Sequence, residues 1–222
     1  MKNKYKTIGI LGGMGPEATA ELYSRIIKIF QKKYGAVYDN DFPEIIILNL
    51  PLPDIVKKVN NNVEKTLIYG AKKLESSGVD FIAIPCNTVT PYIKILKENV
   101  SVPIINIVEE TAKEVKNSNL KKIGLLATET TINDKIYSAY LPKLITLDEK
   151  NQKITTKLIM NILSGDKSGK KMILKLIKKL KEKGAEKVIL GCTELPLIYN
   201  GEDIFDTIDI LARIIVRNSK II

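Results

Sequence analysis

The sequence contains no histidine, and this absence excludes several kinds of catalysis. Without imidazole there can be no Ser-His-Asp or Cys-His catalytic pair, no histidine-ligated zinc and no histidine proton shuttle. Acid–base chemistry must therefore use Cys, Asp, Glu, Lys or Tyr. Tryptophan is also absent, and aromatic residues make up only 6% of the chain. These are too few for the stacking platforms that bind single-stranded nucleic acid.

Long apolar runs and cysteines are scarce as well. No apolar stretch approaches the ~18 residues expected of a membrane span, and residues 1–6 are polar, unlike a secretory signal. The only two cysteines lie far apart in the sequence, which favours free thiols in a reducing compartment over a disulfide framework. We therefore predict a cytoplasmic protein that does not associate with membranes.

Positive charge is abundant, with a formal net charge of +10. The most basic segment, residues 170–183, carries an apolar stripe at helical spacing, formed by Met172, Ile173, Leu176, Ile177 and Leu180. This pattern predicts a packed helix with a solvated lysine face rather than a membrane-surface helix. We expect no nucleic-acid partner, although a positive field modestly favours anionic small molecules.

Two stretches share one design, residues 78–88 and 184–194. Each begins with a glycine that ends a lysine-rich helical run, continues through an apolar run of strand length and reaches a cysteine eight residues after the glycine. Cys86 and Cys192 thus hold equivalent places, 106 residues apart. Gly9 and Gly124 start a second matching pair of segments, which indicates that the chain consists of two related halves.

Strands that alternate with helices predict an α/β fold with two pseudo-symmetric domains, each a parallel sheet flanked by helices. We assign residues 1–102 with the C-terminal helix 208–222 to one domain and residues 103–207 to the other. Parallel sheets bind ligands off the carboxyl ends of their strands. Both cysteines fall at such ends, so we expect the active site in the cleft between the domains. Thr128 opens the first helix of the second domain, predicted to reach about Tyr140.

The turn at residues 12–19 follows the first predicted strand and opens a helix to about Lys33. Its glycines do not have the G-x-G-x-x-G spacing of a dinucleotide site, and the Gly-Lys-Ser/Thr of a phosphate loop is missing. Small residues let a ligand approach the backbone closely, so the N–H groups of this turn suit a carboxylate.

Three motifs then carry a family resemblance: Gly-Gly-Met-Gly-Pro-Glu-Ala-Thr at 12–19, Pro-Cys-Asn-Thr at 85–88 and Gly-Cys-Thr-Glu at 191–194. Together they resemble the aspartate/glutamate racemase family, most closely its aspartate racemase branch. The resemblance implies an amino-acid racemase without cofactor or metal, acting on aspartate or a similar acid, and a homodimer. It places Cys86 and Cys192 on opposite faces of the substrate Cα. The substrate-binding residues that it implies are Met14, Asn87, Thr88, Val89, Thr128, Lys167, Thr193 and Glu194.

The chemistry suits a pair of thiols. Racemisation needs a base on one face of Cα and an acid on the other, both held in line. A free thiol of pKa ~8.5 is only a few per cent thiolate at pH 7, so neighbouring N–H groups and hydroxyls must stabilise the charged form. One cysteine alone at a strand end is more often a small core residue. Two at equivalent positions favour a catalytic pair over a structural role or a disulfide.

The sequence also departs from the family pattern. Thr90 stands where the family usually has histidine, and Ile55 stands where aspartate racemases often have arginine. The family's carboxylate-binding lysine matches either Ser164 or Lys167, and Lys57 or Lys58 are possible substitutes. Two alternatives therefore stay open: a related isomerase or racemase with another substrate, such as glutamate or a hydantoin, and a non-catalytic dicarboxylate-binding protein.

Overall fold

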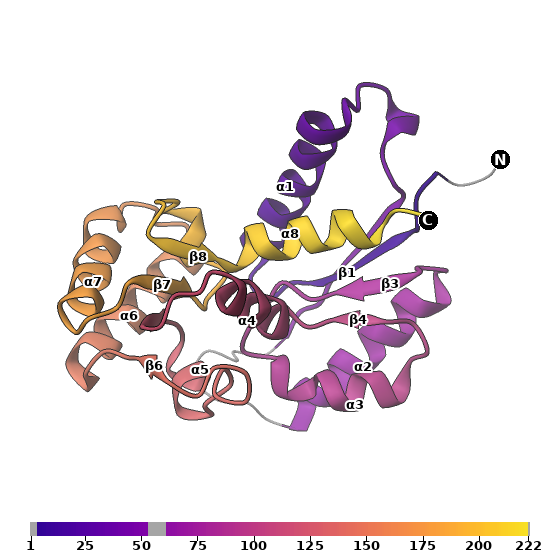
Figure 1. The fold of residues 1–222 in the computed structure, drawn as a ribbon. Coiled ribbons are helices and arrows are strands. Elements are labelled where there is room, and N and C mark those ends of the chain that lie inside the picture. Colours follow the sequence, from indigo (N-terminus) through magenta and orange to yellow (C-terminus); the bar gives the residue numbers. More distant parts are fainter. Residues whose placement is uncertain (1–3, 53–60, 222) are drawn as a thin grey trace.

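The chain forms two four-stranded parallel sheets, each flanked by helices, in a computed structural model that describes residues 4–52 and 61–221 (Figure 1). The strand orders are β2-β1-β3-β4 and β6-β5-β7-β8. The second order repeats the first, with each strand replaced by its counterpart four places later. The predicted α/β class and the duplication are therefore confirmed. None of the helices in these residues is both long enough and apolar enough to cross a bilayer.

The first sheet and its helices come from the N-terminal part of the chain. Their bounds are β1 Ile8–Gly12, α1 Pro16–Tyr34, β2 Ile45–Asn49, α2 Asn61–Ser76, β3 Phe81–Ala83, α3 Ile93–Asn99, β4 Ile104–Ile105 and α4 Ile107–Asn117. Short 3₁₀ turns at Asp39–Asp41 and Thr90–Tyr92 join these elements. Pro16 suits the first turn of α1, because its missing N–H would have no helical partner there.

The second sheet repeats the plan. Its elements are β5 Ile123–Leu126, α5 Glu129–Asn133, β6 Leu144–Ile145, α6 Glu149–Leu163, α7 Lys170–Glu182, β7 Lys187–Leu190, β8 Ile204–Asp206 and α8 Thr207–Asn218, with a 3₁₀ turn at Leu195–Leu197. The repeat extends to the helix caps. Asn106 accepts hydrogen bonds from the first N–H groups of α4, and Asp206 does the same for α8.

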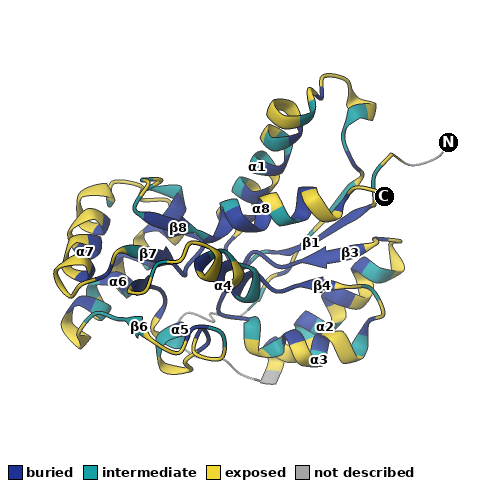
Figure 2. Cartoon of the chain, in the orientation of Figure 1, coloured by how far each residue is buried: buried dark blue, intermediate teal, exposed yellow. Residues whose placement is uncertain are grey.

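The two halves share one hydrophobic core. It contains Ile8 and Ile10 of β1, together with Ile189 of β7 and much of α4 and α8. Each half adds a core of its own, beneath α2 and α3 in the first and beneath α6 and α7 in the second. Figure 2 shows the inner strands of both sheets buried between helices whose outer faces are exposed, whereas the edge strands β2 and β6 are only partly buried. Burial of each large aliphatic side chain contributes about 1.5–3 kcal/mol.

Helix α8 connects the halves. It follows the last strand of the second sheet but packs against α1 and α4 (Figure 1). The assignment of residues 208–222 to the N-terminal half stays a prediction. The boundary after residue 102 stays a prediction, and β4 pairs with β3 in the first sheet.

Several local predictions were wrong. The helix that begins after Thr128 ends at Asn133 instead of near Tyr140, because β-branched residues favour it weakly and Lys135 takes a left-handed conformation with φ 51°. Strand β8 was not predicted. In the basic helix, Met172 is 38% exposed, whereas the rest of the predicted stripe is buried.

Candidate active site

One small cavity of about 170 Å³ lies off the carboxyl ends of the central strands of both sheets. Both halves contribute to its wall. The lining residues are Gly13, Met14, Gly15, Pro16, Leu52, Cys86, Asn87, Thr88, Thr128, Leu163, Cys192, Thr193 and Glu194. Ligand pockets for drug-sized molecules measure ~300–1,000 Å³, so this cavity suits a small metabolite.

Cys86 reaches the cavity because β3 ends early. The strand was predicted to run to the cysteine, but it stops at Ala83, and Pro85, which has no N–H, cannot continue the ladder. The chain turns instead, and the Cys86 N–H donates to the carbonyl of Ile84. Burial and the nearby Glu194 carboxylate raise the pKa of the Cys86 thiol to about 12. The N–H groups of Thr88 and Val89 act in the opposite direction, since they stabilise a thiolate.

Cys192 occupies the equivalent position after β7, with Gly191 between strand and cysteine. Its Sγ donates to the Oε2 atom of Glu194 at 2.9 Å. Burial, together with the charge of this carboxylate, raises the thiol pKa well above its usual value. Both thiols are therefore protonated near pH 7, and both are free rather than joined in a disulfide.

Glu194 is a buried carboxylate, only 4% exposed. Its Oε1 atom accepts the backbone N–H of Gly15 at 3.3 Å, and its Oε2 atom accepts from Cys192 and from the Thr193 hydroxyl. Burial raises the Glu194 pKa, so this group can hold a proton closer to neutral pH than a surface carboxylate can. The glycine turn thus binds a carboxylate, as its sequence suggests, but the carboxylate belongs to the protein itself.

Three threonine hydroxyls meet where Thr88 and Thr128 line the cavity, with Thr131 behind them. Thr88 of the first half lies within 3.2 Å and 3.3 Å of the hydroxyls of Thr128 and Thr131 in the second. Thr128 also caps α5 through the N–H of Thr131. Hydroxyls can donate or accept, so this cluster offers the cavity adjustable hydrogen-bonding groups.

Three further hydrogen bonds join the halves around Asn87 and Thr193, two buried residues of the cavity wall. The Tyr137 hydroxyl donates to the Asn87 Oδ1 atom at 2.7 Å, and the Asn87 amide donates to Thr207 at 3.5 Å. Thr193 donates to the carbonyl of Pro85 at 3.2 Å. Tyr137 and Thr207 were missed from sequence, because no motif surrounds them and each contacts Asn87 across a long sequence separation.

Most of the predicted site residues come together here, and two lie elsewhere. Val89 is buried in the core of the first half and does not line the cavity. Lys167 is exposed and pairs with Glu17 at 3.2 Å, away from the cavity wall. Lys57 and Lys58, like Ile55, lie outside the described residues. Thr90, at the family's histidine position, has a buried hydroxyl without a hydrogen-bond partner.

The described part of the wall has a distinctive chemical character. It contains no lysine or arginine, one carboxylate, and apolar side chains from Met14, Pro16, Leu52 and Leu163. Among the described residues, no three His, Cys, Asp or Glu side chains are grouped in a way that could hold a metal ion.

The sequence model of the Asp/Glu/hydantoin racemases matches residues 11–215 of this chain. The chain belongs to that family. Among curated proteins, the broad specificity amino-acid racemase RacX of Bacillus subtilis is 43% identical over 136 residues. That match covers 60% of this chain and 60% of RacX.

Solved structures of the family have the same fold. An aspartate racemase from Picrophilus torridus superposes with a TM-score of 0.82 at 28% identity, covering 96% of this chain and 93% of that one. An aspartate racemase homologue from Pyrococcus horikoshii gives 0.78 at 28% identity, with 96% and 98% covered. A glutamate racemase from Francisella tularensis in complex with D-glutamate shares the fold at 0.71 and 19% identity, with 98% and 81% covered.

Proposed function

We propose that this chain is a cofactor-independent amino-acid racemase in which Cys86 and Cys192 are the two acid–base groups. The observation that carries the proposal is that both thiols line one small cavity, each from the equivalent position of its own half. A Cα atom held between them would have one sulfur on each face. The family assignment over residues 11–215 supports the same reaction class.

Proton transfer follows from this arrangement. For one enantiomer, the thiolate of Cys86 removes the Cα proton, and the electron pair left behind delocalises into the substrate carboxylate. The thiol of Cys192 then gives its proton to the opposite face, which leaves Cys86 protonated and Cys192 as thiolate. The other enantiomer uses the two groups in reverse order. Backbone N–H groups and hydroxyls of the cavity stabilise the developing negative charge.

The raised pKa values of the thiols mean that the mechanism needs a proton acceptor, and Glu194 is placed to be one. A protonated thiol must lose its proton before it can act as a base, and Glu194 Oε2 is 2.9 Å from the Cys192 sulfur. We assign Glu194 as the group that receives this proton. Cys192 is then reprotonated by the Cα proton and Cys86 becomes the thiolate, so Glu194 releases its proton through solvent to Cys86. Cys86 has no carboxylate partner among its described hydrogen bonds; its thiolate is stabilised by the N–H groups of Thr88 and Val89.

The substrate is the finer part of the proposal. Aspartate follows from the motif resemblance and from the structural similarity to aspartate racemases. A second candidate is an amino acid with an uncharged side chain. It is favoured because the described cavity wall carries apolar residues and one carboxylate but no cation to pair with a second substrate carboxylate. The similarity to the broad specificity racemase RacX agrees with this second candidate. We also propose a homodimer.

The decisive experiment is racemisation in D₂O without added cofactor, followed by circular dichroism and mass spectrometry. Enantiopure aspartate, glutamate, alanine and methionine should be compared. We expect loss of optical activity with deuterium at Cα for at least one of them. Cys86→Ser and Cys192→Ser should each abolish racemisation in both directions while the melting temperature stays near that of the wild type. Activity that survives either substitution would exclude the two-thiol mechanism. An amino acid that raises the melting temperature but keeps its optical rotation would instead indicate a binding protein.

A further inference from the structure

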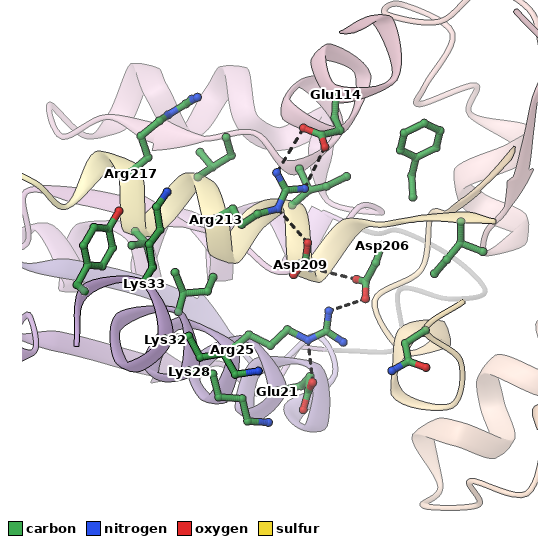
Figure 3. Close-up of a pocket in the computed structure, with 18 of the residues that line it drawn as sticks. Glu21, Arg25, Lys28, Lys32, Lys33, Glu114, Asp206, Asp209, Arg213 and Arg217 are labelled. Carbon is green, nitrogen blue, oxygen red and sulfur yellow. Dashed lines mark hydrogen bonds and ion pairs between the residues drawn. The ribbon is translucent and has the colours of Figure 1, made fainter. Parts of the chain in front are cut away.

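A second hollow, much larger than the catalytic cavity, lies between α1 and α8. Its volume is about 1160 Å³, and residues of β8 together with Asn200 and Gly201 also line it (Figure 3). All three arginines of the chain line it, together with Lys28, Lys32, Lys33, Lys187 and Lys220. We infer that this α1–α8 groove binds a small anion bearing several phosphate groups.

The groove has a built framework. Arg25 of α1 pairs with Glu21 and with Asp206, the cap of α8. Arg213 of α8 pairs with Asp209 and reaches Glu114 of α4. Figure 3 shows these ion pairs along the floor, with the guanidinium groups already facing carboxylates. These two arginines therefore fix the geometry and leave little charge for a ligand.

Of the remaining cations, Arg217 lies 3.9 Å from Glu110 of α4, whereas the five lysines make no ion pair among the described residues. Eight basic and four acidic residues line the groove, a formal surplus of four positive charges. Lys28 and Lys32, both exposed, make no ion pair among the described residues, and they stand one turn apart on α1. Like charges at this spacing repel each other. Lys33 and Lys220 both lie over the ring of Tyr34, at 5.6 Å and 4.0 Å from its centroid. A bound anion would relieve this concentration of positive charge.

The duplication makes α1 stand out. In the second half, the helix that follows the first strand is α5, with five residues, whereas α1 has 19. Lys28 and Lys32 lie on the part of α1 that has no counterpart in α5. In Figure 1 this part of the helix extends away from the two sheets and beside α8. The extension therefore adds a cationic wall that the repeated fold does not require.

Shape and charge together select the occupant. A second copy of the chain, joined through this face about a twofold axis, would bring the same positive surplus against itself. A flat membrane surface cannot enter a hollow. This positive surplus matches an oligophosphate, because every bridging phosphate carries one negative charge and every terminal phosphate more than one near neutral pH, whereas an amino acid neutralises little of it. Lysine ammonium groups bind phosphate as point charges.

The test is calorimetric titration with inorganic tripolyphosphate at low ionic strength, using the whole chain. We expect saturable binding of one tripolyphosphate per chain, weakened about tenfold or more in Lys28→Gln/Lys32→Gln. The matched control is Lys171→Gln/Lys175→Gln, which removes two exposed lysines at the same spacing from α7, outside the groove. This control should bind as the wild type does.

Three results would overturn the inference: no saturable binding, equal weakening in both double variants, or citrate binding as tightly as tripolyphosphate. The last result would mean that the groove selects charge rather than phosphate. A further titration with ADP distinguishes a nucleotide from a free oligophosphate as the natural source of the groups. Because binding is measured without substrate, failure here leaves the racemase proposal untouched, and failure of the racemase proposal leaves this one standing.

Discussion

Gly15 donates its backbone N–H to the buried carboxylate of Glu194, and 179 residues of sequence separate the two. This bond joins the glycine turn of the first half to the cysteine motif of the second. The absence of a side chain at Gly15 makes the approach possible. A Cβ atom there would lie 2.7 Å from Oε1 of Glu194 and 2.7 Å from Leu163, closer than atoms pack.

Gly15→Ala should therefore lower kcat/KM for racemisation by about tenfold or more, because Glu194 must move and its contact with Cys192 must change. Backbone strain contributes nothing, since Gly15 has φ −85°, which alanine also adopts. Enzyme kinetics together with a melting curve check this. An unchanged kcat/KM in a well-folded variant would contradict the proposed role of the Glu194 contact.

Glu194→Gln should lower the pKa of both thiols. A carboxylate beside a thiol disfavours the thiolate, and the neutral amide removes that repulsion. Thiolate absorbance followed against pH measures the effect. Racemisation should nevertheless slow by about 10²-fold, because the proton acceptor for Cys192 is lost. The equilibrium constant of a racemisation is one, so kcat/KM must fall equally in both directions.

Glu17→Gln is the matched control for that experiment, since Glu17 is an exposed carboxylate in the first turn of α1. Its removal should leave the thiol titration unchanged. A thiol pKa in Glu194→Gln that stays the same or rises would show that the carboxylate does not control the pair.

Alkaline pH should destabilise the fold through Cys86. Its pKa is about 12 in the folded chain against an ordinary value of 9.0, so between these values the unfolded chain has lost the proton and the folded chain has kept it. Stability must then fall as pH rises above about 9, by up to about 1.4 kcal/mol per pH unit.

Urea unfolding of wild type and Cys86→Ala at pH 8, 9 and 10 checks this. Lysine and tyrosine titrate in both proteins and cancel in the difference, so the wild type should lose stability more steeply. Parallel pH dependences in the two proteins would contradict the raised thiol pKa.

Tyr137→Phe should reduce racemase activity, although Tyr137 does not line the cavity. It removes the donor to Asn87 Oδ1 and leaves that buried oxygen unsatisfied, at a cost of about 1–3 kcal/mol in the free energy of unfolding. We expect kcat/KM to fall about tenfold as Asn87 loses its fixed orientation. Tyr140→Phe is the control, because its hydroxyl accepts from Asn106, which does not line the cavity. Equal effects of the two substitutions on kcat/KM would indicate a purely structural role.

The sequence predicted the plan of this protein better than its details. Hydrophobic period and glycine placement located both sheets, and the equal spacing of Gly78–Cys86 and Gly184–Cys192 revealed the two halves. These signals are either local or repeated within the chain, so they can be read from a single sequence.

What escaped prediction depends on distant contacts. Strand β8 is only three residues long and is defined by its pairing with β7. Tyr137 acts across 50 residues on Asn87. The resemblance put Lys167 near the substrate, whereas its side chain turns outward to Glu17. Spacing along the chain cannot decide which way a loop side chain points.

The hydrogen bonds from Thr193 to Pro85 and from Asn87 to Thr207 are buried, whereas Leu163, another residue of the cavity wall, is 38% exposed. The halves are also joined by an exposed ion pair, in which Lys167 of the second half lies 3.2 Å from Glu17 of the first. In the proposed racemase, an amino acid enters and leaves past Leu163 and this exposed ion pair, whose side chains can change rotamer, while the buried hydrogen bonds hold the two cysteine motifs together. Access of the substrate and alignment of the cysteines would then depend on different contacts between the same two halves, exposed ones for access and buried ones for alignment.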